Sequence, residues 1–247
     1  MKDEILLKNG RIGVLLIHGL SKSPDEFKVI AKKLANQDFT VYCPRLPGHI
    51  KCPIGYETCL RELPNVHYRD WERSVDEAFL RLKQWVDEVY VGGISLGANL
   101  AIIIASSHLV DGVISLAGVI YTRGVLTLGS VAIYLAKKIL ARGKGEAIYH
   151  GISVSKLDSM KMAVERTKEA LPRVTAPLLV IHSKYDDIVH PKSAKYIYKK
   201  ANSNKKRLIW LESAHHGIDA IDDANIITEQ IISFINKTAH YDESSGT

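Results

Sequence analysis

The motif Gly-Ile-Ser-Leu-Gly at 93–97 constrains the fold of this 247-residue chain more than any other feature. It lies between a short apolar, β-branched run at 86–91, typical of a buried parallel strand, and a run from 96 onward with apolar residues at helical spacing. At a sharp turn from strand to helix a serine hydroxyl projects out of the sheet, and the flanking glycines avoid clashes as the backbone reverses. The motif alone arises often by chance, but this setting predicts Ser95 as a nucleophile.

Length and composition indicate one globular domain. The chain is 46% hydrophobic and 24% charged, and it is long enough to bury a substantial core. Its longest apolar stretches, such as 100–105, are too short to cross a bilayer, and the N-terminus has no signal-peptide core. We therefore expect an intracellular, cytoplasmic protein with no stable membrane insertion.

The net charge of +6 and a pI near 9.1 raise the question of nucleic-acid binding. The lysines are spread over many segments, and the densest cluster, at 199–207, falls near an expected helix end, where cations suit the helix dipole and solubility. A nucleic-acid-binding protein gathers its cations in one stripe. We expect no nucleic-acid partner.

The chain shows no pattern for a metal or a cofactor. Cys43, Cys52 and Cys59 lack zinc spacing, so we expect reduced thiols, with a bridge between the last two as a minor alternative. No histidines stand at metal spacing, the glycines at 92–97 do not match the dinucleotide fingerprint, and no P-loop is present.

Strand-like and helical runs alternate along much of the chain. Strands are expected at 39–43, 86–91, 112–116, 178–182 and 207–211, and helices from Ser23 onward and at 68–84, 192–201 and 225–235. This alternation predicts an α/β fold with a mostly parallel central sheet and helices on both faces. The loops that leave the strands then meet at one edge of the sheet, where ligands bind.

Two local patterns near the N-terminus make sharper predictions. The runs 4–8 and 11–17, separated by Asn9-Gly10, predict a β-hairpin with a two-residue turn. Ser23, followed by Pro24 and by Glu26 three residues on, predicts a capping box at the start of the first helix.

The alternation breaks between 119 and 173, where the sequence is helical and carries no good strand. An apolar stripe covers 128–139 and a second helical stretch covers 154–171. We interpret 119–173 as a cap, or lid, inserted in a core made of 1–118 and 174–247. A crossover helix elaborated for packing is the alternative.

A serine nucleophile needs a histidine base, and the histidine needs a carboxylate that fixes its tautomer. The loop after the strand 178–182 supplies Asp186 and Asp187, and the loop after the strand 207–211 supplies His215 and His216. The chemistry alone does not separate the two members of either pair. The order serine, aspartate, histidine is that of α/β-hydrolases.

From 14 to about 235 the chain resembles the α/β-hydrolases, and within them the small carboxylesterases and monoacylglycerol lipases with a compact helical cap. The residues that carry this resemblance are 16–20, 45–49, the motif at 93–97, 186–189 and 213–215. It implies Ser95 as nucleophile, Asp186 as the acid in an Asp-x-Ile-Val pattern, and His215 as the base in a Ser-x-His pattern. Asp187 and His216 would then be neighbours of the triad.

The resemblance also implies an oxyanion hole made by the backbone N–H groups of Leu20 and Leu96. Their side chains would line an apolar acyl pocket, and Gly19, Leu128 and Ile188 complete the expected substrate-binding set. The last two named positions lie in the cap and in the acid loop. His18 would support the oxyanion loop through hydrogen bonds, and His49 would be architectural.

These features predict a serine carboxylic-ester hydrolase that acts through an acyl-enzyme on short- to medium-chain acyl esters, monoacylglycerols among them. A small-molecule ester is the expected partner, and a homodimer is left open. Thioesterase, lactonase or acyltransferase chemistry on the same triad is the nearest alternative. A hydrolase-like module that binds an apolar ligand without turnover is the alternative of another class.

Overall fold

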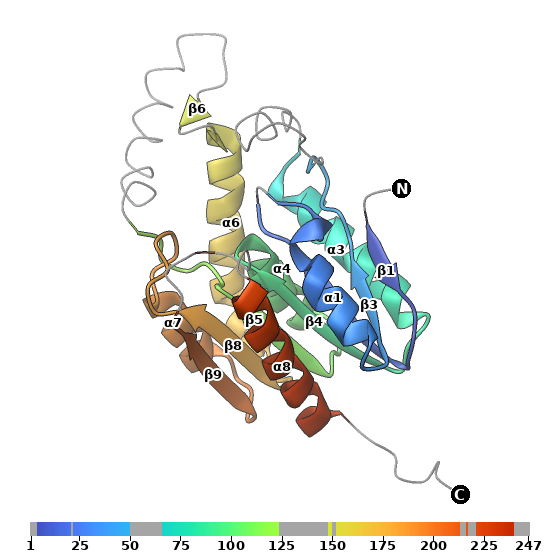
Figure 1. Ribbon diagram of the computed structural model, residues 1–247. Coiled ribbons are helices and arrows are strands. Elements are labelled where there is room, and N and C mark those ends of the chain that lie inside the picture. The colour runs from blue at the N-terminus through green and yellow to red at the C-terminus, as the bar shows by residue number, and fades with distance from the viewer. Residues whose placement is uncertain are drawn as a thin grey trace, which may run out of the picture.

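The computed structural model describes residues 4–20, 22–49, 66–123, 148–149, 152–212, 216 and 221–239. A seven-stranded sheet forms its centre (Figure 1). In spatial order the strands are β1 (Ile5–Leu7), β3 (Phe39–Cys43), β2 (Ile12–Ile17), β4 (Glu88–Ile94), β5 (Gly112–Leu116), β8 (Leu178–Ser183) and β9 (Lys206–Leu211). Every neighbouring pair is parallel except β1 and β3. The predicted α/β architecture with a mostly parallel sheet is confirmed.

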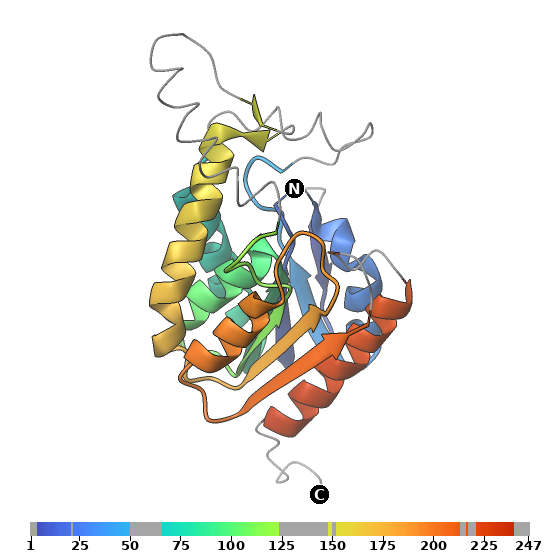
Figure 2. The ribbon, with the colours of Figure 1, turned by 90° about the vertical axis from the view of Figure 1, so that its left-hand side faces the viewer.

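Helices cover both faces of this sheet (Figures 1 and 2). One face carries α1 (Lys28–Ala35) and α8 (Ile221–Thr238), and the other carries α3 (Tyr68–Lys83), α4 (Leu96–Ala105), α6 (Val154–Ala170) and α7 (Lys192–Lys200). Along β2, Val14 and Leu16 pack in the hydrophobic core on the side of α1 and α8. Leu15 and Ile17 pack in the core on the side of the other four helices. Both sides of the strand are buried, which explains its continuous apolar sequence.

Helix α3 shows how sequence pattern becomes packing. Its apolar stripe, which includes Trp71, Val75 and Phe79, is buried against the sheet. At its start the Asp70 carboxylate accepts a hydrogen bond of 2.8 Å from the His67 N–H, one of the backbone donors that a helix start leaves unpaired. The helix expected at 68–84 is therefore found with nearly the same bounds.

The predicted N-terminal hairpin is wrong. β1 pairs with β3, not with β2, so the chain passes over one strand position at Asn9-Gly10 instead of turning back. Asn9 is fixed by the chain around β3, because its N–H donates to Thr40 Oγ1 at 3.0 Å and its side chain donates to the Ala35 carbonyl at 2.6 Å. A dipeptide typical of a tight turn here connects two strands that are not neighbours in the sheet.

The predicted capping box is also wrong. Pro24–Phe27 forms a 3₁₀ turn, η1, before α1, and Ser23 makes no side-chain capping bond there. The Glu26 carboxylate instead accepts a hydrogen bond of 2.9 Å from the Gly19 N–H. A residue that local spacing assigns to a helix start thus fixes the loop after β2.

The segment expected to form a cap is described only in part. The apolar stripe at 128–139 lies outside the described residues, whereas the predicted helix 154–171 is present as α6, followed by the short 3₁₀ turn η2 (Leu171–Arg173). A two-stranded hairpin, β6 (Ile148–Tyr149) and β7 (Ile152–Ser153), precedes α6, although no strand was expected here. Figure 2 shows α6 extending beyond the sheet, with the hairpin at that end. The boundaries of the cap stay a prediction.

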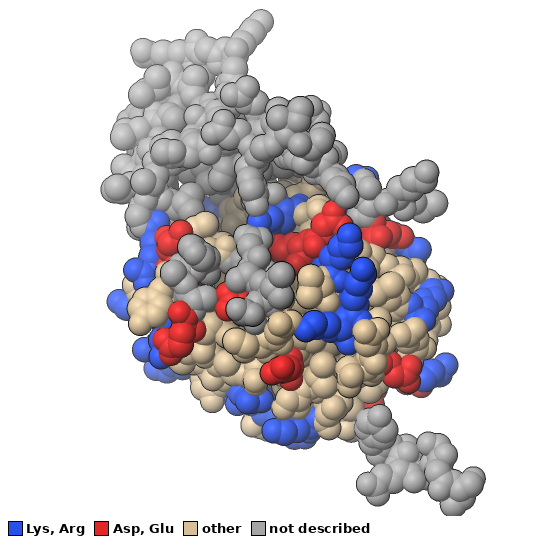
Figure 3. All heavy atoms as spheres, viewed as in Figure 1, with Lys and Arg blue, Asp and Glu red and all other residues tan. Residues whose placement is uncertain are grey.

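On the face seen in Figure 3, described side chains of both charges are interspersed over the helices and loops. Within the described parts of the chain, no helix combines the length and the apolar character needed to cross a bilayer. The Cys43 side chain is buried in the core, and burial raises the pKa of its thiol. Cys52 and Cys59 lie outside the described residues.

Candidate active site

Ser95 occupies a sharp turn between β4 and α4. Its backbone has φ 55° and ψ −118°, a conformation that non-glycine residues rarely adopt and that functional sites retain. The turn is held in place because the Ser95 N–H donates to the Leu116 carbonyl of the neighbouring strand at 2.9 Å. The strand-to-helix setting that the motif predicts is therefore present.

Close packing explains the glycines of this turn. A Cβ atom at Gly97 would stand 1.8 Å from the Ile17 carbonyl oxygen, and one at Gly93 would stand 2.4 Å from the Gly97 carbonyl carbon. Such distances are far below van der Waals contact, so the first turn of α4 can approach the end of β2 only without these side chains. The turn is thereby brought beside the loop that follows β2.

That loop is organised by the buried side chain of His18. Its ring Nδ1 lies 2.8 Å from the Gly19 carbonyl, and its Nε2 lies 3.1 Å from the Leu46 N–H. A neutral ring with its proton on Nδ1 satisfies both contacts, and burial lowers the pKa of His18 to about 3. The contacts are those of a loop-supporting residue, as expected for His18.

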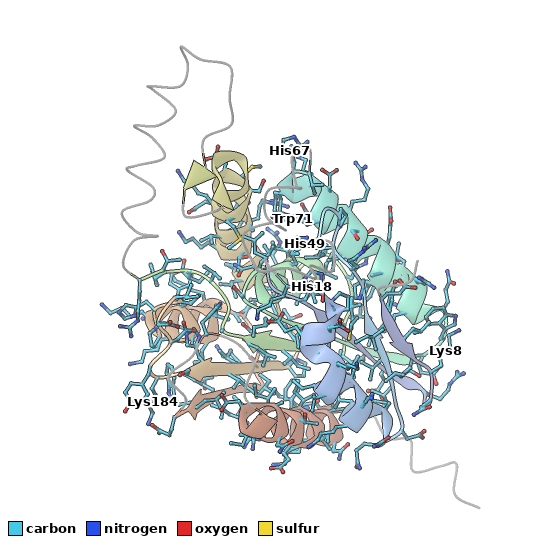
Figure 4. The ribbon with its side chains drawn as sticks, turned by 45° about the horizontal axis from the view of Figure 1, so that its top comes forward. Lys8, His18, His49, His67, Trp71 and Lys184 are labelled. Atoms are coloured by element: carbon cyan, nitrogen blue, oxygen red, sulfur yellow. The ribbon has the colours of Figure 1, made fainter. Side chains whose placement is uncertain are left out.

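His18 is packed in turn against a row of aromatic rings. The rings of His18 and His49 are 4.9 Å apart, and those of His49 and Trp71 are 5.8 Å apart, both in edge-on geometry. Figure 4 shows this row running from the end of β2 toward the start of α3, where His67 lies. The His49 ring thus links the oxyanion loop to α3, which fits the architectural role expected for it.

The two expected oxyanion donors, Leu96 and Leu20, belong to the first turn of α4 and to the loop after β2. Leu96 is the first residue of α4, where backbone N–H groups have no partner within the helix and the helix dipole is positive. Gly19, just before Leu20, is close to the nucleophile, because a Cβ built on Gly19 would be 3.8 Å from the Ser95 Cβ. Sequence reasoning missed Glu26, whose bond to the Gly19 N–H fixes this loop.

Asp186 is the buried acid of the loop after β8. Its Oδ1 accepts hydrogen bonds from the backbone N–H groups of Ile188, at 2.9 Å, and Val189, at 2.7 Å, and its Oδ2 lies 2.8 Å from His216 Nδ1. Burial alone would raise the pKa of Asp186, but the His216 ring and the two N–H groups lower it below its usual value. Asp187, its neighbour, is exposed.

Among the described residues, the histidine bonded to this acid is His216, the neighbour of the expected His215. His215 lies outside the described residues, so its own contacts do not test that prediction. His215 as the base therefore stays a prediction, and the bond of 2.8 Å between Asp186 and His216 makes His216 a second candidate.

A second imidazole, that of His182 in β8, faces the same carboxylate. Its Nε2 lies 3.4 Å from Asp186 Oδ2 and 3.2 Å from the Val189 carbonyl oxygen. Sequence reasoning missed this residue. The available signal was a histidine within an otherwise apolar strand, four residues before the predicted acid.

The remaining predicted residues are only partly characterised. Leu20 is half-buried, Leu96 is fully buried, and Ile188 beside the acid is 40% exposed, whereas Leu128 lies outside the described residues. The Ser95 side chain makes no capping hydrogen bond to α4. No group of three metal-ligating side chains occurs in the parts of the chain that the structure describes.

Two family models match the sequence. The model described as "alpha/beta hydrolase fold" matches residues 13–141, which include β2, Ser95 and α4. The model described as "Serine aminopeptidase, S33" matches residues 137–220, which include the loop of Asp186. Together the two matches extend over the Ser95 turn, Asp186 and His216.

Three similar proteins cover almost the whole chain. A thermostable monoacylglycerol lipase of Bacillus sp. (strain H-257) is 27% identical over 240 residues, 94% of this chain and 93% of that one. A carboxylesterase of Bacillus subtilis (strain 168) is 19% identical over 93% of this chain and 94% of that one. A solved structure from work on LipS and LipT, two metagenome-derived lipolytic enzymes, has a TM-score of 0.81 at 25% identity, covering 95% of this chain and 97% of that one.

Proposed function

Because this chain belongs to the α/β-hydrolase family, we propose that it hydrolyses carboxylic esters with Ser95 as nucleophile, His216 as base and Asp186 as acid. The observation that carries this proposal is the bond of 2.8 Å between Asp186 Oδ2 and His216 Nδ1. It lies at the edge of the sheet from which the Ser95 turn also leaves, since β4 and β8 are both parallel to β5, which separates them. The names of the similar proteins, a monoacylglycerol lipase and a carboxylesterase, support the same reaction class.

The tautomer of His216 fits the role of a general base. Its Nδ1 faces a carboxylate that can only accept, so Nδ1 carries the proton and Nε2 presents a lone pair. Nε2 takes the Ser95 Oγ proton as that oxygen attacks the ester carbonyl, and the ionised Asp186 stabilises the resulting imidazolium. An ionised Asp186 needs its pKa below the working pH, which is the direction that its hydrogen bonds impose.

The reaction then proceeds in two balanced halves. In the first, the tetrahedral intermediate collapses, the bond to the leaving alcohol breaks, and the His216 imidazolium protonates that alcohol, which leaves an ester on Ser95. In the second, His216 takes a proton from water, the hydroxide attacks the acyl-enzyme, and the imidazolium returns its proton to Ser95. The products are one alcohol and one carboxylic acid.

The oxyanion of each tetrahedral intermediate is held by the backbone N–H groups of Leu96 and Leu20. The Glu26 carboxylate engages the Gly19 N–H, which sets the direction of the peptide that follows. Losing one such donor costs roughly 100- to 1,000-fold in rate. We assign short- to medium-chain acyl esters, including monoacylglycerols, as substrates, and residues 119–173 as a cap above the site.

The test is turnover of chromogenic esters of graded acyl length by the wild-type chain and by Ser95→Ala. We expect turnover by the wild type and a loss of roughly a million-fold in the variant, because the three groups act as a unit. Ser107→Ala, an exposed serine just beyond the other end of α4, is the matched control and should leave the rate unchanged. A phosphonate ester should label the wild type and the control at Ser95.

Two results would overturn the proposal. One is a Ser95→Ala variant that keeps most of its ester turnover. The other is a folded wild-type chain that turns over no ester of any length and resists phosphonate labelling, as a module that only binds ligands would. Faster turnover of thioesters, or acyl transfer to an added alcohol, would change the proposed substrate class but not the proposed triad.

A further inference from the structure

His182 is a buried titratable residue that the mechanism above does not use. Its side chain is fully buried near the C-terminal end of β8, and its Nε2 lies 3.4 Å from Asp186 Oδ2. That same oxygen lies 2.8 Å from His216 Nδ1. Two imidazoles from different strand ends therefore face one carboxylate oxygen.

The contacts of His182 fix its tautomer. Nε2 faces two acceptors, Asp186 Oδ2 and, at 3.2 Å, the Val189 carbonyl oxygen, so Nε2 carries a proton. Nδ1 is buried, and no hydrogen-bond partner faces it among the described residues. A second proton there would bury an unpaired N–H, so the ring stays neutral, and burial lowers the pKa of His182.

These contacts link His182 to the acid loop at two points, Val189 and Asp186. The Val189 N–H donates to Asp186 Oδ1 at 2.7 Å, and the Val189 carbonyl oxygen faces His182 Nε2. The ring of Trp210 in β9 meets the His182 ring edge-on at 6.2 Å between centroids, so the imidazole is packed from the next strand. His182 is thereby held rigidly and can hold the acid loop 186–189 in turn.

We propose that His182 is a positioning residue for the Asp186–His216 pair, holding the acid loop through Nε2–H and occupying the side of Asp186 Oδ2 that His216 leaves open. This inference rests on the proposed function. A carboxylate that faces the positive end of a further N–H dipole is less basic, so the shared proton stays on His216 Nδ1 when the imidazolium forms. The same N–H dipole opposes extra positive charge on His216.

In the part of the chain that the structure describes, three titratable groups act on His182. Asp186 and His216 stand across the acid loop, and His190 precedes α7, while Trp210 contributes an uncharged ring from β9. Of the titratable groups, Asp186 alone carries a negative charge. A substitution of His182 should therefore act mainly on the geometry and charge of the Asp186–His216 pair.

The experiment compares His182→Gln with His182→Leu, with rates expressed per active site titrated by a phosphonate ester. Glutamine keeps an N–H donor near the position of Nε2, whereas leucine fills the space without one. We expect His182→Leu to lose roughly 10- to 100-fold in kcat with little change in KM, because small displacements in a catalytic pair are costly. His182→Gln should stay within a few fold of the wild type.

The pH dependence separates positioning from mere packing. Without the Nε2–H dipole the His216 imidazolium is better stabilised, so the acid limb of kcat/KM in His182→Leu should move to higher pH, with no such move in His182→Gln. His108, just after α4, lies 2.5 Å from Asp76 in α3. His108→Gln and His108→Leu are therefore matched controls that should leave the rate and its pH dependence unchanged. Should His182→Leu not fold, His182→Asn replaces it, because the shorter amide cannot reach both acceptors.

Two outcomes would overturn the inference. The first is a His182→Leu variant with the kcat of the wild type and no shift in the acid limb of its kcat/KM profile. The second is an equal loss in both variants with no pH shift, which a packing role alone would produce. Failure of the proposed function would look different, because the wild-type chain itself would then resist phosphonate labelling.

Discussion

At the scale of single residues, His215 and His216 are adjacent in sequence, and our proposal assigns the base to His216, whose bond to the buried acid is described. Asp186 Oδ1 is occupied by two backbone N–H groups, and Oδ2 is bonded to His216. A histidine base loses its tautomeric control without such a bond. In the proposed mechanism, His216 takes the proton from Ser95 and later returns it.

Glutamine substitutions at the two positions test this assignment. His216→Gln removes the base and should lower kcat by roughly 10⁴- to 10⁶-fold, because the remaining rate comes from the oxyanion hole and binding. His215→Gln should keep kcat within about tenfold of the wild type, since oriented proton transfer is intact. Steady-state ester hydrolysis measures both. The opposite ranking would restore His215 as the base and reduce His216 to a neighbour of the acid.

These residues show which parts of a site a sequence can predict. The places of Ser95 and Asp186 at strand ends were predictable, because each follows a recognisable strand in a loop of defined pattern. The choice between His215 and His216 stays a prediction, and the bond of His216 to Asp186 depends on how the fold brings their two loops together. His182 was missed and Glu26 was assigned to a helix cap, because sequence spacing does not show that they contact Asp186 and the Gly19 N–H.

At the scale of secondary-structure elements, Asn99 joins three segments that are distant in sequence. It is buried in α4, one turn after Ser95, and its amide bonds both the N–H and the carbonyl of Val119, at 2.9 and 2.8 Å. Its Nδ2 also lies 2.8 Å from Thr167 Oγ1 in α6. The nucleophile helix is thereby tied to the chain leaving β5 and to the helix that returns to the core.

Replacing Asn99 by alanine should loosen this junction. The change leaves two backbone groups of Val119 buried without partners, so we expect the free energy of unfolding to fall by about 2–4 kcal/mol. Thr167→Val removes a single bond to Asn99 and should cost about half as much. Urea denaturation of both variants and the wild type measures the difference. An Asn99→Ala variant as stable as the wild type would show that Asn99 does not hold these elements together.

Elements were predicted well where one pattern dominates. The strands 39–43 and 112–116 agree fully with β3 and β5, because short, mostly apolar runs buried on both faces are typical of central parallel strands. The N-terminal hairpin failed because Asn9-Gly10 permits a turn without requiring one, and pairing of β1 with β3 is decided by the whole sheet. Local sequence reports conformation, but strand order depends on partners far along the chain.

At the scale of the whole molecule, burial of neutral histidines makes stability depend on pH. His18 and His182 are both held neutral in the fold, and burial lowers the pKa of each, that of His18 to about 3. In the unfolded chain both should titrate near 6.5, the unperturbed value. Below about pH 6.5 the unfolded state thus binds protons that the folded state does not, so the free energy of unfolding decreases as the pH falls.

The size of this effect can be predicted for His18. Its contribution is fully present above pH 6.5 and is lost progressively toward its folded pKa of about 3. Between pH 7.5 and 5.5 His18 alone should lower the free energy of unfolding by about 1.4 kcal/mol, one pKa unit of differential protonation. Urea denaturation at the two pH values measures it. In His18→Gln the absolute stability will drop, but the difference between the two pH values should shrink by that amount. Equal unfolding free energies of the wild type at both pH values, or an undiminished difference in His18→Gln, would show that His18 is protonated in the folded protein and that its ring does not hold the oxyanion loop as a neutral donor and acceptor.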